Sequence, residues 1–150
     1  MTKIFKLNRK FIGDKVLIYD KDDLLYELSS KFSVSGQKMI FCDVKEKSTI
    51  FTFKQHWTLV KEIYDIYDIG NNLVGQVKIG SLEDHIYFDE KNNIRVKSLF
   101  NNKFKIQDDR MTLEKLKESF YELKIMDFDS IGLSTLAALA LIVKINLSSG

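Results

Sequence analysis

The chain has 150 residues, of which 45% are hydrophobic and 29% are charged, and its formal net charge is +2. These values predict a folded chain with a sizeable core and exclude a disordered one. The small net charge argues against nucleic acid as a partner, since surfaces that bind it carry a strong basic excess. The single cysteine excludes an internal disulfide and any metal site built on cysteine pairs.

The first ten residues alternate charged with apolar side chains and lack the apolar block of a secretory signal. We therefore expect a cytoplasmic protein. The chain has no proline and seven glycines, and no stretch has the composition of a linker. Residues 1–150 are accordingly expected to form one domain.

Apolar residues recur with a period of two along most of the chain. Phe5, Leu7 and Phe11 alternate with charged residues at its start. Pairs of short apolar runs follow, each pair separated by a polar turn: 16–19 and 24–28, 39–44 and 50–53, 63–69 and 73–79, 86–88 and 94–96. Hairpins at such regular spacing predict an up-and-down all-β sheet or barrel.

An aspartate recurs where these hairpins turn. Asp20, Asp43, Asp68 and Asp89 each follow an apolar residue or cysteine, and Asp108 is a weaker copy, at spacings of about 19 to 25 residues. At the first position of a turn, a carboxylate accepts backbone N–H groups two residues further on. We expect this structural role for all five.

The segment from Met111 to Ser119 can be read in two ways. Leu113, Leu116 and Phe120 would share one face of a short helix capped by Thr112, whereas Met111 and Leu113 also alternate as in a strand. The strand is preferred, with residues 115–119 as a loop.

The C-terminal stretch from Ile131 to Leu147 predicts a helix without a polar face. It has no charge before Lys144, and its apolar residues surround the helix on every side. The uncharged run to Val143 has about 13 residues, fewer than the roughly 20 of a membrane span, so a tail anchor is the weaker alternative. We expect Asp129 or Ser130 to cap this helix, and Lys144 to extend out of the structure near its end.

Packing connects the strands with the helix. Six hairpins supply about twelve strands, and a barrel with more than about eight strands needs contents, such as a helix about 10 to 12 Å across. The prediction is a closed antiparallel β-barrel of about twelve strands that encloses the C-terminal hydrophobic helix. The residues expected at the centre are Leu136, Ala138, Leu139, Leu141 and Ile142.

The hairpin repeat, the run Tyr121–Asp129 and the terminal sequence Leu-Ala-Ala-Leu-Ala-Leu-Ile-Val together resemble the LURP-one-related group of the Tubby and phospholipid-scramblase superfamily. The resemblance covers nearly the whole chain and implies a twelve-stranded barrel with the helix threaded through it. Glycine commonly follows the turn aspartate in that group, and here only Gly70 does so. Functions in the superfamily range from phosphoinositide binding to membrane association and proposed lipid scrambling.

Candidate catalytic residues are few. His56 and His85 have no second histidine or cysteine at metal-ligand spacing, and Cys42 lies in an apolar run where a thiol acts as a small buried hydrophobe. Asp127 and Asp129 lack the glycine and distal glutamate of a calcium loop. We expect no enzyme, no cofactor and no metal site.

The best candidate binding site is the basic N-terminal segment. Lys3, Lys6, Arg9 and Lys10 could bind an anionic phospholipid or phosphoinositide headgroup, although Lys3 and Arg9 would face one side of a strand and Lys6 and Lys10 the other. The alternative is an edge strand protected by lysines. The expected function is a binding or scaffold module, peripheral at the membrane. A lipocalin-like carrier of a small apolar ligand, with the terminal helix outside the barrel, is the alternative.

Overall fold

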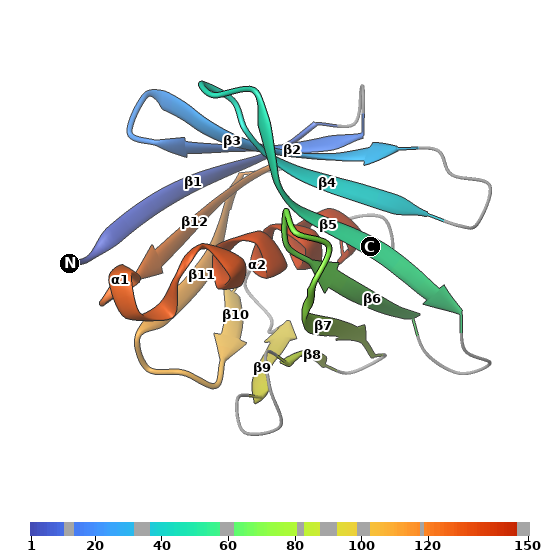
Figure 1. Ribbon diagram of the computed structural model, residues 1–150. Helices are drawn as coiled ribbons and strands as arrows, with labels where there is room; N and C mark the ends of the chain where they lie inside the picture. Colours follow the sequence, from blue (N-terminus) through green and yellow to red (C-terminus); the bar gives the residue numbers. More distant parts are fainter. Residues whose placement is uncertain are drawn as a thin grey trace.

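The structure is a computed structural model, and it describes residues 1–10, 14–31, 37–57, 62–80, 83–87, 93–98, 103–117 and 119–146. The described residues form twelve strands and two helices (Figure 1). The strands are β1 (Lys3–Lys10), β2 (Lys15–Asp20), β3 (Asp23–Lys31), β4 (Lys38–Asp43), β5 (Ser48–Trp57), β6 (Glu62–Tyr67), β7 (Leu73–Ile79), β8 (Asp84–Tyr87), β9 (Asn93–Ser98), β10 (Lys103–Ile106), β11 (Met111–Lys117) and β12 (Phe120–Ile125). The helices are α1 (Phe128–Ile131) and α2 (Leu133–Asn146).

Each strand pairs antiparallel with the next one in the chain, and β1 pairs with β12 to close the barrel. The predicted closed antiparallel barrel with a C-terminal helix is therefore confirmed. The interpretation of the N-terminal segment as an edge strand is wrong, because β1 has a hydrogen-bonded neighbour on both sides. Sequence patterns could not reveal this pairing, since its partners lie more than 100 residues apart.

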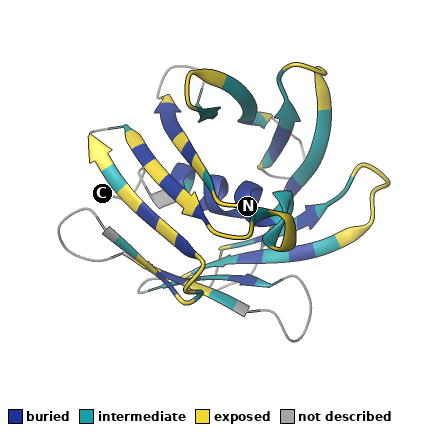
Figure 2. Ribbon diagram, turned by 90° about the vertical axis from the view of Figure 1, so that its left-hand side faces the viewer, coloured by how far each residue is buried: buried dark blue, intermediate teal, exposed yellow. Residues whose placement is uncertain are grey.

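The strands alternate buried with exposed residues, as Figure 2 shows for several of them. In β12, Tyr121, Leu123 and Ile125 are buried and the residues between them are exposed. This pattern arises because successive side chains of a strand point to opposite faces of the sheet. One face of each strand thus faces the interior of the barrel and the other faces the outside.

The turn aspartates have the expected role at three described positions. Their carboxylates accept backbone N–H groups: Asp43 from Glu46 at 2.9 Å, Asp68 from Asn72 at 2.9 Å, and Asp108 from Arg110 at 3.0 Å. The hydrogen bond from the Asn72 backbone also holds the pKa of Asp68 below its usual value. Asp89 lies outside the described residues, and Asp20 has a different partner, given below.

The ambiguous segment is a strand. β11 runs from Met111 to Lys117, with an irregularity in its pairing between Lys115 and Lys117. The expected loop from Lys115 is wrong, because pairing with β12 extends the strand to Lys117. Neighbouring strands thus override the helical propensity of this stretch.

Helix α2 lies inside the barrel (Figures 1 and 2). The residues from Leu136 to Val143, which include all five of the expected central residues, have no exposed surface. They form one core with the inward side chains of the strands. The helix therefore occupies the space in which a lipocalin-like carrier would hold its ligand, and it does not pack on the outside. None of the helices in the described ranges has the length and apolar character needed to cross a membrane.

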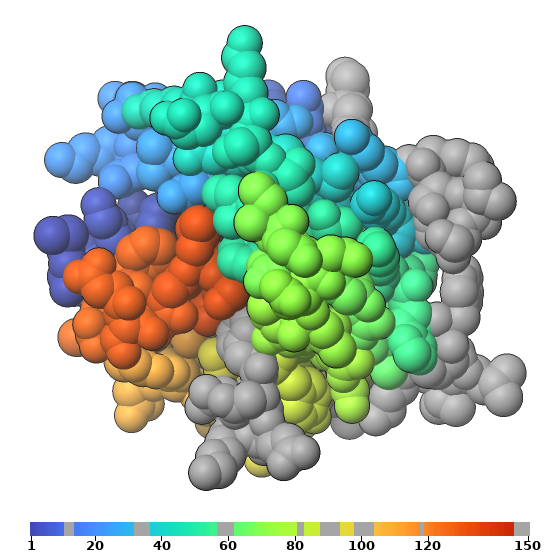
Figure 3. Space-filling model, in the orientation of Figure 1, coloured from blue at the N-terminus to red at the C-terminus, as the bar shows by residue number. Residues whose placement is uncertain are grey.

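The start of the helical segment differs from the expected capping. Asp127 is the N-cap of α1, with a left-handed backbone and no side-chain hydrogen bond to the helix, and Asp129 lies in the first turn. Gly132, at φ 85°, separates α1 from α2, and this backbone conformation favours glycine. Neither Asp129 nor Ser130 is therefore the cap. Figure 3 shows the α1 region at the surface, beside the start of β1.

Candidate functional site

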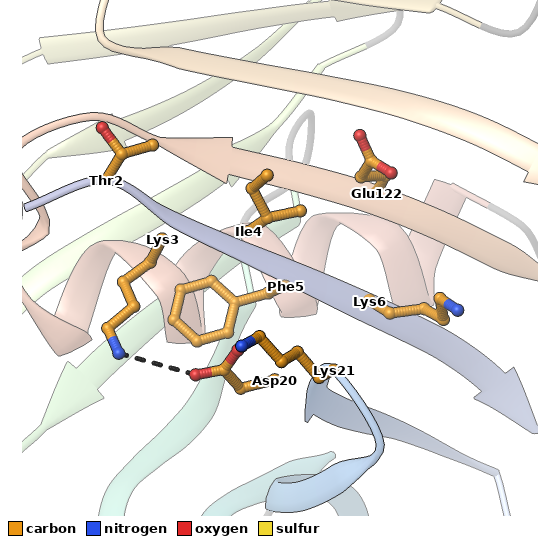
Figure 4. A pocket seen from close by; sticks show the side chains of 8 residues that line it. All are labelled: Thr2, Lys3, Ile4, Phe5, Lys6, Asp20, Lys21 and Glu122. Atoms are coloured by element: carbon orange, nitrogen blue, oxygen red, sulfur yellow. Dashed lines mark hydrogen bonds and ion pairs between the residues drawn. The ribbon is translucent and has the colours of Figure 1, made fainter.

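A pocket of about 470 Å³ lies beside the start of β1 (Figure 4). Three parts of the chain meet there, namely β1, the turn between β2 and β3, and β12. Its lining residues are Thr2, Lys3, Ile4, Phe5, Lys6, Asp20, Lys21 and Glu122. Two of the four residues predicted to bind an anionic headgroup, Lys3 and Lys6, belong to this pocket.

Barrel closure brings the charged groups of the pocket together. Lys6 lies opposite Glu122 of β12, and Phe5 lies opposite Asp20 at the end of β2. The Lys3 ammonium group forms an ion pair with the Asp20 carboxylate at 3.5 Å, and both side chains are about one-third exposed. An exposed pair of this kind contributes little to stability, so its lysine can exchange the carboxylate for another anion at small cost.

Lys21 enters the pocket from the turn between β2 and β3. Its φ of 56° is a left-handed conformation, which in a two-residue hairpin turn favours asparagine or glycine. With Lys3 and Lys6 it supplies three ammonium groups against the two carboxylates of Asp20 and Glu122. The lining therefore has a surplus of one positive charge, which suits a singly or doubly charged anion.

An apolar surface adjoins these charges. Ile4 extends from the same face of β1 as Lys6, opposite to Lys3, and is half exposed, at 50%. Phe5 points inward and packs against Phe128 of α1, with ring centroids 5.3 Å apart. Rigid packing of Phe5 fixes the backbone from which Lys3, Ile4 and Lys6 extend. The arrangement can hold an anionic group beside an apolar one.

Arg9 and Lys10 do not belong to the pocket. Lys10 is exposed at the far end of β1, whereas the Arg9 side chain points inward and is only 6% exposed. The Arg9 guanidinium forms an ion pair with Asp14 at 2.9 Å and donates to the Lys144 carbonyl at 3.3 Å. Arg9 thus joins the barrel wall to the end of α2 and is separated from Lys3 and Lys6 of the predicted set.

Lys144 completes this buried ion cluster. Its ammonium group lies 2.9 Å from the Asp14 carboxylate, and its side chain is 4% exposed. The prediction that Lys144 extends out of the barrel is therefore wrong, because its side chain is buried and its ammonium group binds the Asp14 carboxylate. Burial raises the pKa of Asp14, but hydrogen bonds from Lys144 and Ser30 and the charge of Arg9 outweigh burial and leave the pKa below its usual value.

The histidines and the cysteine lie elsewhere. His56 is half exposed and lies 3.4 Å from Asp65, and His85 lies 3.3 Å from Glu83. Cys42 is half-buried, so the expectation of a fully buried thiol is only partly right. Among the described residues, no three histidine, cysteine or carboxylate side chains are grouped so that they could hold a metal ion.

Sequence reasoning missed several pocket residues. Asp20 was assigned to the turn series, and Thr2, Ile4, Lys21 and Glu122 were not singled out. The one usable signal is the place of Lys21 in the predicted polar turn at residues 20–23, whereas its left-handed backbone is known only from the structure. Glu122 could not have been placed beside Lys6, because only the β1–β12 register brings them together.

Comparisons of the chain with known protein families, with curated proteins and with solved structures give no match.

Proposed function

We propose that this protein is a non-enzymatic binding module of the LURP-one-related type that associates with anionic phospholipid or phosphoinositide headgroups. The headgroup would occupy the pocket beside β1, with the protein cytoplasmic and peripheral at the membrane. The resemblance of the chain to that group supports the family assignment, together with a fold that is the one the resemblance implies.

The observation that carries the proposal is the composition of the pocket. Lys3, Lys6 and Lys21 line one open pocket together with a half-exposed Ile4, with Lys3 and Lys21 on one side of β1 and Ile4 on the other (Figure 4). Ammonium groups attract the phosphate of a headgroup, and an exposed aliphatic side chain beside them can enter the apolar boundary of the bilayer. A free phosphate would use only the first of these features.

The test measures headgroup binding in the absence of a membrane. The isotope-labelled protein would be titrated with a soluble inositol phosphate and followed by amide chemical shifts. We expect the largest shifts in the segment from Thr2 to Lys6 and at Lys21. Binding should be at least about tenfold weaker for the Lys3→Gln/Lys6→Gln variant, since a hydrogen bond to a charged group contributes about 1.5 to 3 kcal/mol.

The matched control is Lys38→Gln/Lys54→Gln, which removes two lysines paired across β4 and β5. It lowers the net charge by the same amount and leaves the pocket intact. Shifts confined to residues away from the pocket, or equal losses in the two variants, would contradict the proposal. A response to inorganic phosphate as strong as that to the inositol phosphate would indicate a phosphate site without headgroup selectivity.

A further inference from the structure

Three lysines form a row across the outer face of the barrel, from β9 to β12. Lys97 of β9 lies directly opposite Lys105 of β10. The β10–β11 pairing ends at Phe104 opposite Leu113, and Lys105 and Thr112 are the next residues beyond that pair; Thr112 lies opposite Lys124 of β12. All three lysines are exposed, and the row spans three strand spacings, about 14 Å. We refer to Lys97, Lys105 and Lys124 as the lysine row.

The lysine row is electrostatically unfavourable for the isolated protein. Like charges directly opposite each other on neighbouring strands destabilise a sheet. Neither Lys97 nor Lys105 forms an ion pair with a residue in the described part of the chain. An external anion that neutralises them would therefore stabilise this face.

The described registers contain three other cross-strand lysine pairs, and two of them differ in this respect, whereas Lys31 opposite Lys38 does not. Lys15, opposite Lys10, forms an ion pair with Glu27 at 3.5 Å. Lys54, opposite Lys38, faces Asp65 on its other neighbouring strand and lies over the Tyr67 ring. Compensation within the protein thus accompanies the pairs Lys10–Lys15 and Lys38–Lys54. Lys31–Lys38 and Lys97–Lys105 have no carboxylate partner in the described residues, so the apolar side chains near the second pair have to distinguish it.

Exposed apolar side chains adjoin one end of the lysine row. Lys124 lies opposite Ile4, which is 50% exposed, and Met126, the residue after the end of β12, is 48% exposed. Cations beside exposed aliphatic side chains are typical of surfaces that lie in the membrane interface. In the described registers no aromatic side chain lies directly opposite Lys97, Lys105 or Lys124, whereas binding of a nucleic-acid base uses an aromatic ring for stacking, and an acidic peptide would not use Ile4 and Met126.

We propose that the face formed by the lysine row, Ile4 and Met126 lies against an anionic lipid bilayer. The inference rests on the proposed function and extends it, because it specifies which side of the barrel meets the membrane. Ile4 belongs both to this face and to the pocket. A headgroup in the pocket and the bilayer surface can therefore be bound at the same time.

Vesicle sedimentation of the full chain tests the charges of the row. Phosphatidylcholine vesicles with and without phosphatidylserine serve as the probe. We expect binding only to the anionic vesicles, reduced about 25-fold in Lys97→Gln/Lys105→Gln, because each lysine near an anionic surface contributes about fivefold. Lys38→Gln/Lys54→Gln is again the control with the same change in charge and should bind much closer to wild type.

The outcomes separate the two proposals. If Lys97→Gln/Lys105→Gln and the control lose vesicle binding equally, the proposed membrane face is overturned. The pocket could still bind its headgroup in the titration described above. A loss in the row variant together with no response to the inositol phosphate would support the face and contradict the pocket. Binding of wild type to an oligonucleotide or to polyglutamate, without binding to anionic vesicles, would overturn the inference.

Fluorescence quenching tests the orientation independently of charge. Met126→Trp should be quenched by brominated lipid in anionic vesicles, because this position would lie in the interface. Leu73→Trp is the control. Leu73 is 59% exposed and lies on β7, which is five strands away from β12 around the barrel. Both variants also contain Trp57, so the wild-type protein is measured to give the quenching of Trp57 alone. Equal quenching at the two positions would contradict the proposed face.

Discussion

Lys21 and Lys47 occupy left-handed positions in two hairpin turns, with φ values of 56° and 54°. A side chain other than glycine in this conformation is strained by about 1 kcal/mol. Only Lys21 lines the pocket. Strain retained at a binding position is consistent with a role of its side chain, and the pair provides a matched comparison.

We therefore predict opposite effects of one substitution on stability and on binding. Lys21→Gly should raise the free energy of unfolding by about 0.5 to 1 kcal/mol, because glycine removes the strain, and should weaken headgroup binding. Lys47→Gly should give the same stabilisation and leave binding unchanged. Denaturant unfolding and the inositol phosphate titration measure the two effects, and equal binding by both variants would argue against Lys21 as a pocket residue.

Asp14 is a single carboxylate between two cations, Arg9 and Lys144, that are almost fully buried. Removing one partner of a buried pair leaves an uncompensated charge. We predict that Asp14→Asn lowers the free energy of unfolding by about 2 to 3 kcal/mol, less than for a fully buried pair because solvent reaches the carboxylate. Asp23→Asn, which removes the exposed ion pair with Lys45, should change it by less than about 1 kcal/mol.

The contribution of Asp14 should depend on pH. Its pKa is lowered in the folded state, so its stabilisation is complete above the usual pKa of about 4 and disappears as the pH falls through the lowered value. The difference in unfolding free energy between wild type and Asp14→Asn should thus be constant near neutrality and shrink below about pH 4. A difference that stays the same in acid would show that the Asp14 charge does not stabilise the fold.

Among the elements, α2 has an unusual environment for a helix. Strands surround it, and its residues from Leu136 to Val143 are completely buried, so it lacks the polar face of a surface helix. Alanines at positions 137, 138 and 140 reduce its width. A helix of this composition is enclosed by the barrel and also fills it.

Two substitutions in α2 test this packing. Leu139→Ala should lower the free energy of unfolding by about 2 to 5 kcal/mol, through lost burial and a cavity, and Ala138→Asp should prevent stable folding by burying a charge. Leu73→Ala, at an exposed site, is the control and should change it by less than about 0.5 kcal/mol. Chemical denaturation monitored by circular dichroism gives these values. A mild effect of Ala138→Asp would mean that the helix reaches solvent.

At the scale of the whole molecule, barrel and helix depend on each other. A chain that ends at Asp129 would retain every strand but leave the inward apolar side chains without contacts. We predict insoluble or molten protein, with secondary structure but without a cooperative unfolding transition. Calorimetry and near-ultraviolet circular dichroism detect this state. A soluble, cooperatively folding truncated chain would show that α2 is dispensable for the fold.

The sequence by itself determined most elements of this protein, although the end of β11 and the break between α1 and α2 at Gly132 appear only in the structure. Alternation with a period of two identified the hairpins, and the absence of a polar face in the C-terminal stretch required that the strands surround it. Both are local patterns, because the faces of a strand or helix are set by residues two to four positions apart. Turn chemistry at Asp43, Asp68 and Asp108 was equally local, since each carboxylate binds a backbone group within four residues.

Only the tertiary structure decided which distant residues meet. Lys6 and Glu122 become neighbours through strand register and barrel closure, and no local pattern encodes the register between remote strands. The same reason separates Arg9 from Lys3 and Lys6. All three are basic residues on one strand. Arg9, however, points inward near the other end of β1 from Lys3. It therefore contacts Asp14 and the end of α2, where it stabilises the fold.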